Sequence, residues 1–420
     1  MSKSKTPDKN EVPFGAALQD RPVPRISIHA FCENPETGNA IQRAGQDRRM
    51  AKAHLTVHMG GMFGAVEYFQ DSTTPNVIMV ETRERGPAIL NELEKLAHVC
   101  DPGTKVIVIG QSNDISLYRE MIRQGISEYL VAPLNPLQII EALAAIYGGQ
   151  SGAPLGKVFA FYGSRGGAGS STFAHSTAWA IAEDLHIATT IVDLDVSFGT
   201  TGLDFNQDAG QGIAEALASP ERLDDVLLDR LLIKQSGKLN LFISPAALDR
   251  DGLISVEAVE TVIDAVRQLS PCVIIDMPHL WAPWVKHVLT TSDEIIVTAT
   301  PDLASLRNCK NIYDLLNQAR PNDKPLKFVL NQVGIPRRPE IPVKDFAEAM
   351  GTDPAIIMPF DPQTFATANN NGQTVGELNS QSRAAQSFRE LAQILTGRES
   401  RLEVKTNGKL SFDFLRRKKA

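Results

Sequence analysis

Short runs of apolar and β-branched residues recur along the chain, separated by segments long enough to form helices. In the first part of the chain they are RISIHAF, HLTVHMG, NVIMVE, KVIVIG and SEYLVAP. Stretches with a helical period of apolar residues cover 88–99, 115–124 and 137–147. This alternation predicts a parallel sheet with crossover helices over 25–148, preceded by a disordered leader over 1–24.

A second alternating series follows a linker at 149–156 that is rich in Gly, Ser and Pro. Its apolar runs are KVFAFYGS, TTIVDLD, LNLFIS, PCVIIDMP, EIIVTAT and LKFVLNQV. Nearly continuous apolar strands are buried on both faces of a sheet. The sequence therefore predicts an α/β fold with two three-layer α/β/α domains. The second domain spans 157–397 with a mostly parallel sheet, and a polar, basic tail follows at 398–420.

Composition narrows the class of protein. The 420 residues carry a net charge of −7, which argues against a protein whose whole surface binds nucleic acid. No run of about 18 apolar residues is present, and the polar N-terminus lacks a secretory signal, so we expect a cytoplasmic protein. The four cysteines have no metal-ligand spacing and are expected to be free thiols: Cys32, Cys100, Cys272 and Cys309.

The segment GSRGGAGSST at Gly163–Thr172 lies between an apolar strand and an apolar-periodic helix. A glycine-rich turn at this place lets backbone N–H groups wrap a polyphosphate, and the helix dipole adds partial positive charge. The segment departs from the P-loop pattern GxxxxGK[ST], because Ser164 replaces the first glycine and Ser170 replaces the lysine. The alternative is a glycine-rich turn with a purely structural role.

This loop, followed in order by VDLD, VIIDMP, LNQV and MPFDP, resembles the deviant Walker motif of the MinD/ParA superfamily. The resemblance implies a P-loop NTPase domain that binds ATP with Mg²⁺. It places Arg165 where a lysine reaches the nucleotide of the partner subunit, which gives Arg165 a catalytic role across a dimer. The resemblance also implies that these residues contact the nucleotide: Ser164, Arg165, Gly166, Gly167, Ala168, Gly169, Ser170, Ser171 and Thr172.

The later motifs receive their roles from the same resemblance. Ser171, Asp195 and Asp276 would hold Mg²⁺, and Asp195 would also position the attacking water. The alternative for the carboxylates at strand ends is that they cap turns. Asn331 would read the edge of the base. The ring of the base would be framed by Phe360, Asp361 and Pro362.

The missing lysine bears on catalysis, because phosphoryl transfer depends on positioning and on neutralising the charge of the phosphates. Ser170 can donate a hydrogen bond but cannot neutralise a phosphate. We therefore expect hydrolysis to be weak or lost, while backbone amides, Mg²⁺ and Arg165 preserve binding.

The order of elements in the first domain resembles a response-regulator receiver domain, which has a flavodoxin-like fold. The residues of acyl-phosphate chemistry are missing: Glu81 stands where the phosphoacceptor Asp would be, and Ala132 stands where the Lys would be. Glu33 alone is a poor substitute for the acidic pair. We expect this domain to escape phosphorylation and to provide a docking or dimerising surface.

A pseudo-receiver joined to a MinD/ParA-like domain resembles the TadZ/CpaE family, with local matches in SRGGAGSST, DLDVSFGTTGLDFNQD and PFDPQTFATANNNGQ. The resemblance implies a localisation and assembly factor for the Tad/Flp type IV pilus. Such a factor forms a homodimer on ATP binding and recruits the secretion ATPase and inner-membrane pilus components. It would act at the cell pole, peripherally associated with the inner membrane.

The main alternative is a ParA-type partitioning ATPase that binds DNA nonspecifically. That function needs basic residues on the dimer face and hydrolytic turnover, whereas this chain is acidic and has Ser170 in place of the lysine. We expect no specific nucleic-acid partner.

The C-terminal residues LSFDFLRRKK combine apolar side chains with four cations. They resemble in character the short tails that tether MinD-type proteins to membranes, and each cation near an anionic surface contributes about 1 kcal/mol. The alternative is a solvated terminus.

Overall fold

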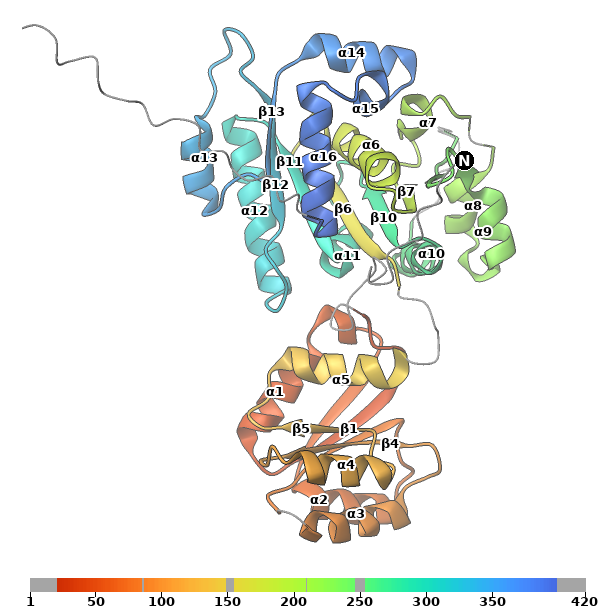
Figure 1. The fold of residues 1–420 in the computed structure, drawn as a ribbon, viewed down its shortest axis with the longest axis vertical. Coiled ribbons are helices and arrows are strands. Elements are labelled where there is room, and N and C mark those ends of the chain that lie inside the picture. Colours follow the sequence, from red (N-terminus) through yellow and green to blue (C-terminus); the bar gives the residue numbers. More distant parts are fainter. Residues whose placement is uncertain (1–20, 85–86, 149–154, 209, 246–253, 399–420) are drawn as a thin grey trace, which may run out of the picture.

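A computed structural model describes residues 21–84, 87–148, 155–208, 210–245 and 254–398. The predicted tail from residue 399, the leader up to residue 20 and most of the predicted linker lie outside these residues. The described residues form two α/β units, which lie one above the other along the long axis (Figure 1). The predicted fold class is confirmed.

The N-terminal unit holds a five-stranded parallel sheet in the order β2-β1-β3-β4-β5. Its strands are β1 (Ser27–Cys32), β2 (His54–Met59), β3 (Val77–Glu81), β4 (Lys105–Gly110) and β5 (Glu128–Val131). Its helices are α1 (Pro35–Gly45), η2 (Arg48–Met50), α2 (Gly61–Gln70), α3 (Pro87–Val99), α4 (Ile115–Arg123) and α5 (Pro136–Gly148). Apolar side chains of α1 and α5 cover one face of the sheet, and those of α2, α3 and α4 cover the other. This is the three-layer arrangement that the alternating pattern predicts.

The end of the predicted leader differs from the expectation. Val23 is fully buried in the core of the N-terminal unit, and its N–H donates to the carbonyl of Arg49 over 2.7 Å. Burying an apolar side chain stabilises the chain even in a segment whose composition predicts disorder. The expectation that disorder extends to residue 24 is therefore wrong for residues 21–24.

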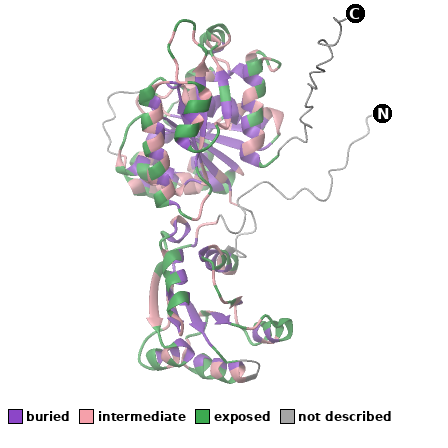
Figure 2. Ribbon diagram, turned by 90° about the vertical axis from the view of Figure 1, so that its left-hand side faces the viewer, coloured by how far each residue is buried: buried purple, intermediate pink, exposed green. Residues whose placement is uncertain are grey.

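The C-terminal unit holds an eight-stranded sheet in the order β13-β12-β11-β6-β10-β7-β9-β8, parallel except for the pair β8 and β9. Its strands are β6 (Lys157–Gly163), β7 (Thr189–Asp193), β8 (Ile233–Lys234), β9 (Leu239–Phe242), β10 (Cys272–Asp276), β11 (Glu294–Ala299), β12 (Lys327–Val333) and β13 (Ile356–Pro359). The apolar run of β6 lies in the middle of this sheet and is almost entirely buried. In Figure 2 the strands of this sheet are mostly purple, the colour of buried residues.

Helices cover both faces of the eight-stranded sheet. Those on one face are α6 (Ser170–Trp179) with the π-helical turn η3 (Ala180–Asp184), α14 (Pro362–Asn371), α15 (Val375–Leu378) and α16 (Arg383–Thr396). Those on the other face are α8 (Gly212–Ala218), α9 (Asp225–Leu231), α10 (Val256–Leu269), α11 (Pro283–Thr291), α12 (Leu303–Ala319) and α13 (Val343–Met350). The short elements α7 (Thr201–Asp204) and η4 (Pro220–Arg222) complete the unit. All four cysteines are free thiols, as expected.

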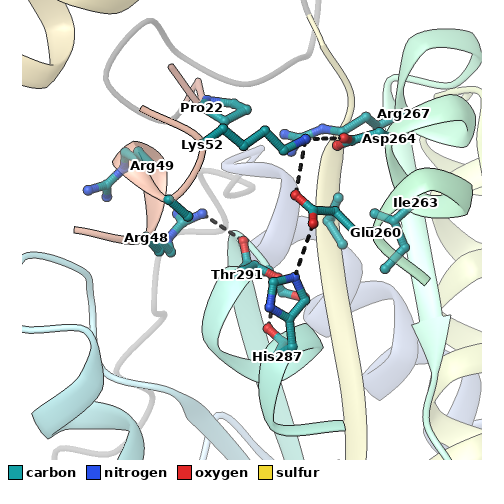
Figure 3. Close-up of a pocket in the computed structure, with 13 residues that line it drawn as sticks. Pro22, Arg48, Arg49, Lys52, Glu260, Ile263, Asp264, Arg267, His287 and Thr291 are labelled. Carbon is teal, nitrogen blue, oxygen red and sulfur yellow. Dashed lines mark hydrogen bonds and ion pairs between the residues drawn. The ribbon is translucent and has the colours of Figure 1, made fainter. Parts of the chain in front are cut away.

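The two units meet in a network of buried ions. Arg48, on η2, donates to Asp323 over 2.7 Å and lies 3.4 Å from Asp293. The side chains of these three residues are less than one-tenth exposed. Arg49 also pairs with Asp323, and the pocket beside this network is lined by both units (Figure 3). The contact lies at the amino ends of β6 and β11, opposite the edge where the strands end.

Replacing Arg48 with alanine should destabilise this contact strongly, because Asp293 and Asp323 would stay buried without that partner. Removing one member of a buried ion pair typically costs about 3–5 kcal/mol. Urea denaturation measures this loss. Lys52 is the matched control, since its pairs with Glu260 and Asp264 are about one-third exposed and Lys52→Ala should cost about 0–1 kcal/mol. Equal losses in the two variants would contradict the account.

Candidate functional site

The glycine-rich loop connects the central strand β6 to the first turn of α6. Gly167 and Gly169 have φ of 76° and 93°, a region that residues with a side chain rarely adopt. Gly169 is the N-cap of α6 and supplies no side-chain hydrogen bond, so the first N–H groups of the helix have no capping partner. Ser171 and Thr172 belong to this first turn. The N-terminus of α6 is therefore arranged as an anion site of the kind that binds phosphates.

Side chains from neighbouring elements hold the carbonyl groups of the loop. Asn331, at the end of β12, donates to the carbonyl of Ala168 over 2.9 Å. The other contacts of this kind are His279 Nδ1 with Gly163 (3.1 Å), Asn308 with Ser164 (2.9 Å) and Gln332 with Gly167 (3.4 Å). These contacts fix the path of the loop, whose backbone N–H groups are the candidate donors toward a ligand.

Two serines of the loop have hydroxyl groups without a partner in the protein. The N–H of Ser164 donates to the carbonyl of Thr298 over 2.8 Å, and its hydroxyl is buried without a hydrogen-bond partner. The hydroxyl of Ser170 is also buried without a partner. Contact of Ser164 and Ser170 with the nucleotide stays a prediction.

Arg165 lies at the rim of the loop with its side chain half exposed. Its guanidinium is 3.3 Å from the carboxylate of Asp302, which caps α12 by accepting the N–H of Ser305. Within one chain Arg165 thus points to Asp302. Exposed pairs of this kind contribute about 0–1 kcal/mol, so Arg165 can leave Asp302 at little cost.

Two carboxylates lie side by side where adjacent strands end. Asp276 of β10 is opposite Asp193 of β7 in the register of the sheet, and both are buried. The hydroxyl of Ser171 donates to Oδ1 of Asp276 over 3.2 Å. Hydroxyl and carboxylate oxygens are the ligands that Mg²⁺ takes beside a polyphosphate, so the predicted pair of Ser171 and Asp276 fits the ion.

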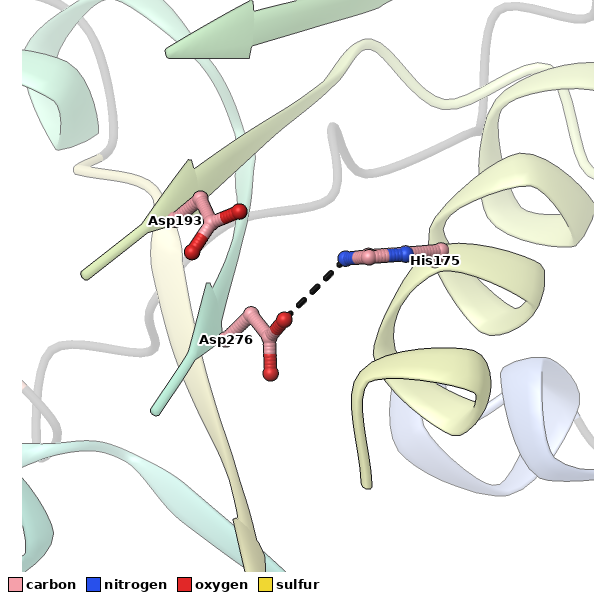
Figure 4. A group of neighbouring side chains, drawn as sticks. All are labelled: His175, Asp193 and Asp276. Atoms are coloured by element: carbon pink, nitrogen blue, oxygen red, sulfur yellow. Dashed lines mark hydrogen bonds and ion pairs between the residues drawn. The ribbon is translucent and has the colours of Figure 1, made fainter. Parts of the chain in front are cut away.

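A buried histidine that sequence reasoning missed joins this group (Figure 4). His175 of α6 has Nε2 3.1 Å from Asp276 and Nδ1 2.6 Å from Asp204. Its Nε2 is also 2.8 Å from the hydroxyl of Thr201, which donates to Asp193 over 2.7 Å. Burial alone would lower the pKa of His175, but the hydrogen bonds to Asp204 and Asp276 raise it above its ordinary value. Burial raises the pKa of Asp193, and the charge of Asp276 adds to this effect.

Asp195 was predicted to hold Mg²⁺ together with Ser171 and Asp276. Ligand atoms of His175, Asp193 and Asp276 all lie within 4.8 Å of one another, and Asp195 is not part of this group. Its carboxylate accepts the N–H of Phe198 over 3.0 Å, and it lines a separate cavity of about 500 Å³ beside α8. Burial raises the pKa of Asp195, and the charge of nearby Asp276 adds to this effect. The roles of Asp195 as a metal ligand and in positioning water both stay predictions.

Of the residues predicted to hold the base, Asn331 contacts the loop. The side-chain oxygen of Asn331 accepts the N–H of Gln332 over 2.8 Å, so both ends of this amide already have protein partners. Asp361 caps α14 by accepting the N–H of Thr364, and Pro362 begins that helix. Phe360 is 38% exposed. Contact of these residues with a base stays a prediction.

In the N-terminal unit, Glu81 ends β3 and is saturated by hydrogen bonds. Its carboxylate accepts the N–H groups of Glu33 and Asn34 over 2.8 and 2.9 Å, and the hydroxyl of Thr37 over 2.8 Å. These donors come from the segment that follows β1, where a receiver domain carries its acidic pair. Glu81 therefore acts as a structural bridge at this edge of the sheet.

Comparisons with known proteins agree with these observations. No family model matches the chain. MinD of Escherichia coli is 25% identical over 222 residues, which are 50% of this chain and 80% of that protein. MinD of Bacillus subtilis is 23% identical over 194 residues, which are 45% of this chain and 66% of that protein.

Solved structures give further matches. A ParA family ATPase from Chlorobium tepidum is 25% identical with a TM-score of 0.52, and the match covers 57% of this chain and 99% of that one. The pilus assembly protein CpaE of Caulobacter crescentus is 54% identical, and the match covers 97% of that structure and 30% of this chain, with a TM-score of 0.30. A CpaE2 protein of Sinorhizobium meliloti is 41% identical over 99% of its structure and 29% of this chain, with a TM-score of 0.28.

Identity of 54% over nearly the whole length of a CpaE structure is far above the level of a shared fold alone. The MinD and ParA matches agree with the phosphate loop and with the mostly parallel sheet around it. The chain therefore belongs to the TadZ/CpaE family of MinD/ParA-related proteins.

Proposed function

We propose that this protein is an ATP-binding localisation and assembly factor for the Tad/Flp type IV pilus, acting as a nucleotide-dependent homodimer. The observation that carries the proposal is the cradle between β6 and α6. Its glycines adopt positive φ, its carbonyl groups are held from outside, and the uncapped end of a ten-residue helix faces it. The CpaE relatives are described as pilus assembly proteins, which supports the biological role.

The nucleotide would bind with its phosphates against the N–H groups of Gly166–Thr172. Ser171 and Asp276 would hold Mg²⁺ there, and the ion would neutralise part of the charge on the phosphates. A MinD structure from Pyrococcus horikoshii, which shares the fold, is described as a complex with Mg-ADP, and this agrees with binding of a nucleotide and Mg²⁺ at such a site.

Measuring ATP binding together with the mass of the protein in solution tests this proposal. We expect saturable binding in the presence of Mg²⁺ and a shift from monomer to dimer mass on adding ATP. A mass that stays unchanged at saturating ATP would refute the nucleotide-dependent dimer.

Hydrolysis should be slow even when ATP is bound. Losing one preorganised charge or donor at a transition state costs about a hundredfold to a thousandfold in rate, and position 170 has lost a full positive charge. We expect phosphate release at least about a hundredfold slower than in relatives that have the lysine. Rapid release by the wild type that disappears in Ser171→Ala would show that another residue replaces the lysine.

The N-terminal unit is proposed to recruit partners such as the secretion ATPase and inner-membrane pilus components. Large apolar side chains are exposed on one side of it, with Phe63 of α2 at 79% and Met59 of β2 at 56%. Exposed apolar groups that lie close together favour docking of another protein. Restriction to the cell pole and contact with the inner membrane belong to the same proposal.

No helix among the described residues has the length and apolar character needed to cross a bilayer. Membrane contact through the C-terminal tail stays a prediction, because that segment lies outside the described residues.

Incubation with acetyl phosphate and Mg²⁺ should leave this protein unmodified, as judged by intact mass. The physical reason is that Glu81 accepts three hydrogen bonds from the segment after β1 and that Ala132 offers no cation. A functional receiver domain treated in parallel is the positive control. An adduct that forms on the wild type and is absent from Glu81→Gln would overturn this prediction.

A further inference from the structure

His175 connects three parts of the site that are far apart in the chain. It lies on α6 four residues after Ser171, so the two side chains share one face of the helix. Ser171 binds Oδ1 of Asp276 at 3.2 Å, and His175 binds Oδ2 at 3.1 Å. Both oxygens of the carboxylate at the end of β10 are thus held by the helix that follows the phosphate loop.

Both nitrogens of the imidazole also contact α7. Nδ1 contacts Asp204, the last residue of α7, at 2.6 Å, and Nε2 contacts Thr201, the first residue, at 2.8 Å. A single side chain therefore bonds to both ends of this short helix and to Asp276. His175 is 1% exposed and Thr201 is fully buried, so water does not compete for these bonds.

α7 presents apolar side chains outward. Leu203 lies on it and Phe198 lies in the turn that precedes it, and each is 71% exposed. Large apolar groups exposed to this degree are typical of surfaces that meet another protein. Leu203 is carried by the helix that these hydrogen bonds anchor, and Phe198 lies in the turn that leads into it.

We propose that His175 is a positioning residue that couples the phosphate loop helix to α7, so that occupancy of the site at Ser171 sets how Phe198 and Leu203 are presented. The inference rests on the nucleotide site proposed above. Nucleotide and Mg²⁺ change the surroundings of Ser171 and Asp276, and His175 transmits that change because it holds Asp276 and α7 at once.

Hydrogen exchange of the amides of α7 and its C-terminal turn tests the coupling. The N–H groups of Asp204, Phe205 and Gln207 donate within this segment over 2.8–3.2 Å, so their exchange reports its opening. We expect Mg-ADP to change their exchange in the wild type by at least about tenfold. The asparagine side chain in His175→Asn is too short to bridge Asp276 and Asp204. In this variant Mg-ADP should therefore change the exchange of these amides by less than about twofold.

A matched pair at Asp204 keeps the test independent of the folding of the His175 variant. The side chain of Asp204 is 15% exposed, and Asn at this position keeps an acceptor for Nδ1 of His175 whereas Ala does not. Asp204→Asn should keep the response of α7 to Mg-ADP, and Asp204→Ala should lose it. A purely structural role would lower the melting temperature in these variants but leave the response to nucleotide intact.

The outcomes separate the two proposals. Binding of Mg-ADP by the wild type without a response in α7, or a full response in both His175→Asn and Asp204→Ala, overturns the coupling alone. Absence of Mg-ADP binding by the wild type overturns the coupling and the proposed function together.

Discussion

Replacing Gly169 with alanine is expected to weaken ATP binding by at least about tenfold, which corresponds to about 1.4 kcal/mol. Gly169 has a φ of 93°, and an added Cβ would lie 2.4 Å from Nδ2 of Asn331. Asn331 cannot yield freely, because the same nitrogen holds the carbonyl of Ala168. The substitution therefore changes the backbone of the cradle and the bond that supports it. Titration with a fluorescent ATP analogue measures the loss.

Gly103→Ala is the matched control for this variant. Gly103 also has a positive φ, at 100°, but no atom lies within 4 Å of its added Cβ, and it precedes β4 in the other unit. Its substitution introduces similar backbone strain without touching the loop, so ATP affinity should stay unchanged. If Gly169→Ala binds ATP as well as Gly103→Ala does, the loop is not the phosphate cradle.

Replacing Arg165 with alanine should weaken the ATP-dependent dimer by about tenfold to a hundredfold while ATP binding to the monomer changes little. A charge-assisted hydrogen bond contributes about 1.5–3 kcal/mol, and a guanidinium grips phosphate oxygens with two parallel bonds. In the single chain Arg165 contacts Asp302 at 3.3 Å and not the cradle, so its contribution should appear when a second chain brings it to a nucleotide. Sedimentation velocity with and without ATP measures the dimer.

Arg307→Ala controls for the loss of a positive charge near the loop. Arg307 is exposed on α12, and its side chain bonds to Asn308 beside it. Dimerisation of the Arg307 variant should match that of the wild type. Equal dimerisation of the wild type and Arg165→Ala would remove the proposed role of Arg165.

Sequence reasoning located the elements well wherever the signal is local. Apolar runs bounded by turn residues predicted β6 and β10, and the apolar period at 88–99 predicted α3 to within one residue. The glycines of the phosphate loop were recognisable because positive φ and close approach of the backbone restrict those positions to Gly. Such features depend on neighbours in the chain, which a single sequence displays.

Features that depend on contacts distant in sequence were missed. His175 lies in FAHSTAWAIA, which has the pattern of a core helix, and nothing in that segment indicates that Asp204 and Asp276 meet it. The register of β7 and β10 places Asp193 directly opposite Asp276, and this neighbour was not assigned from the sequence. Arg48 and Asp323 are 275 residues apart, so their buried pair was beyond prediction from composition or period.

Isothermal titration of the wild type with ATP in the presence of Mg²⁺ tests the central claim most directly. The account predicts saturable binding with about one nucleotide per chain, as a single cradle between β6 and α6 requires. Wild-type protein that shows no saturable binding of ATP under these conditions would contradict it.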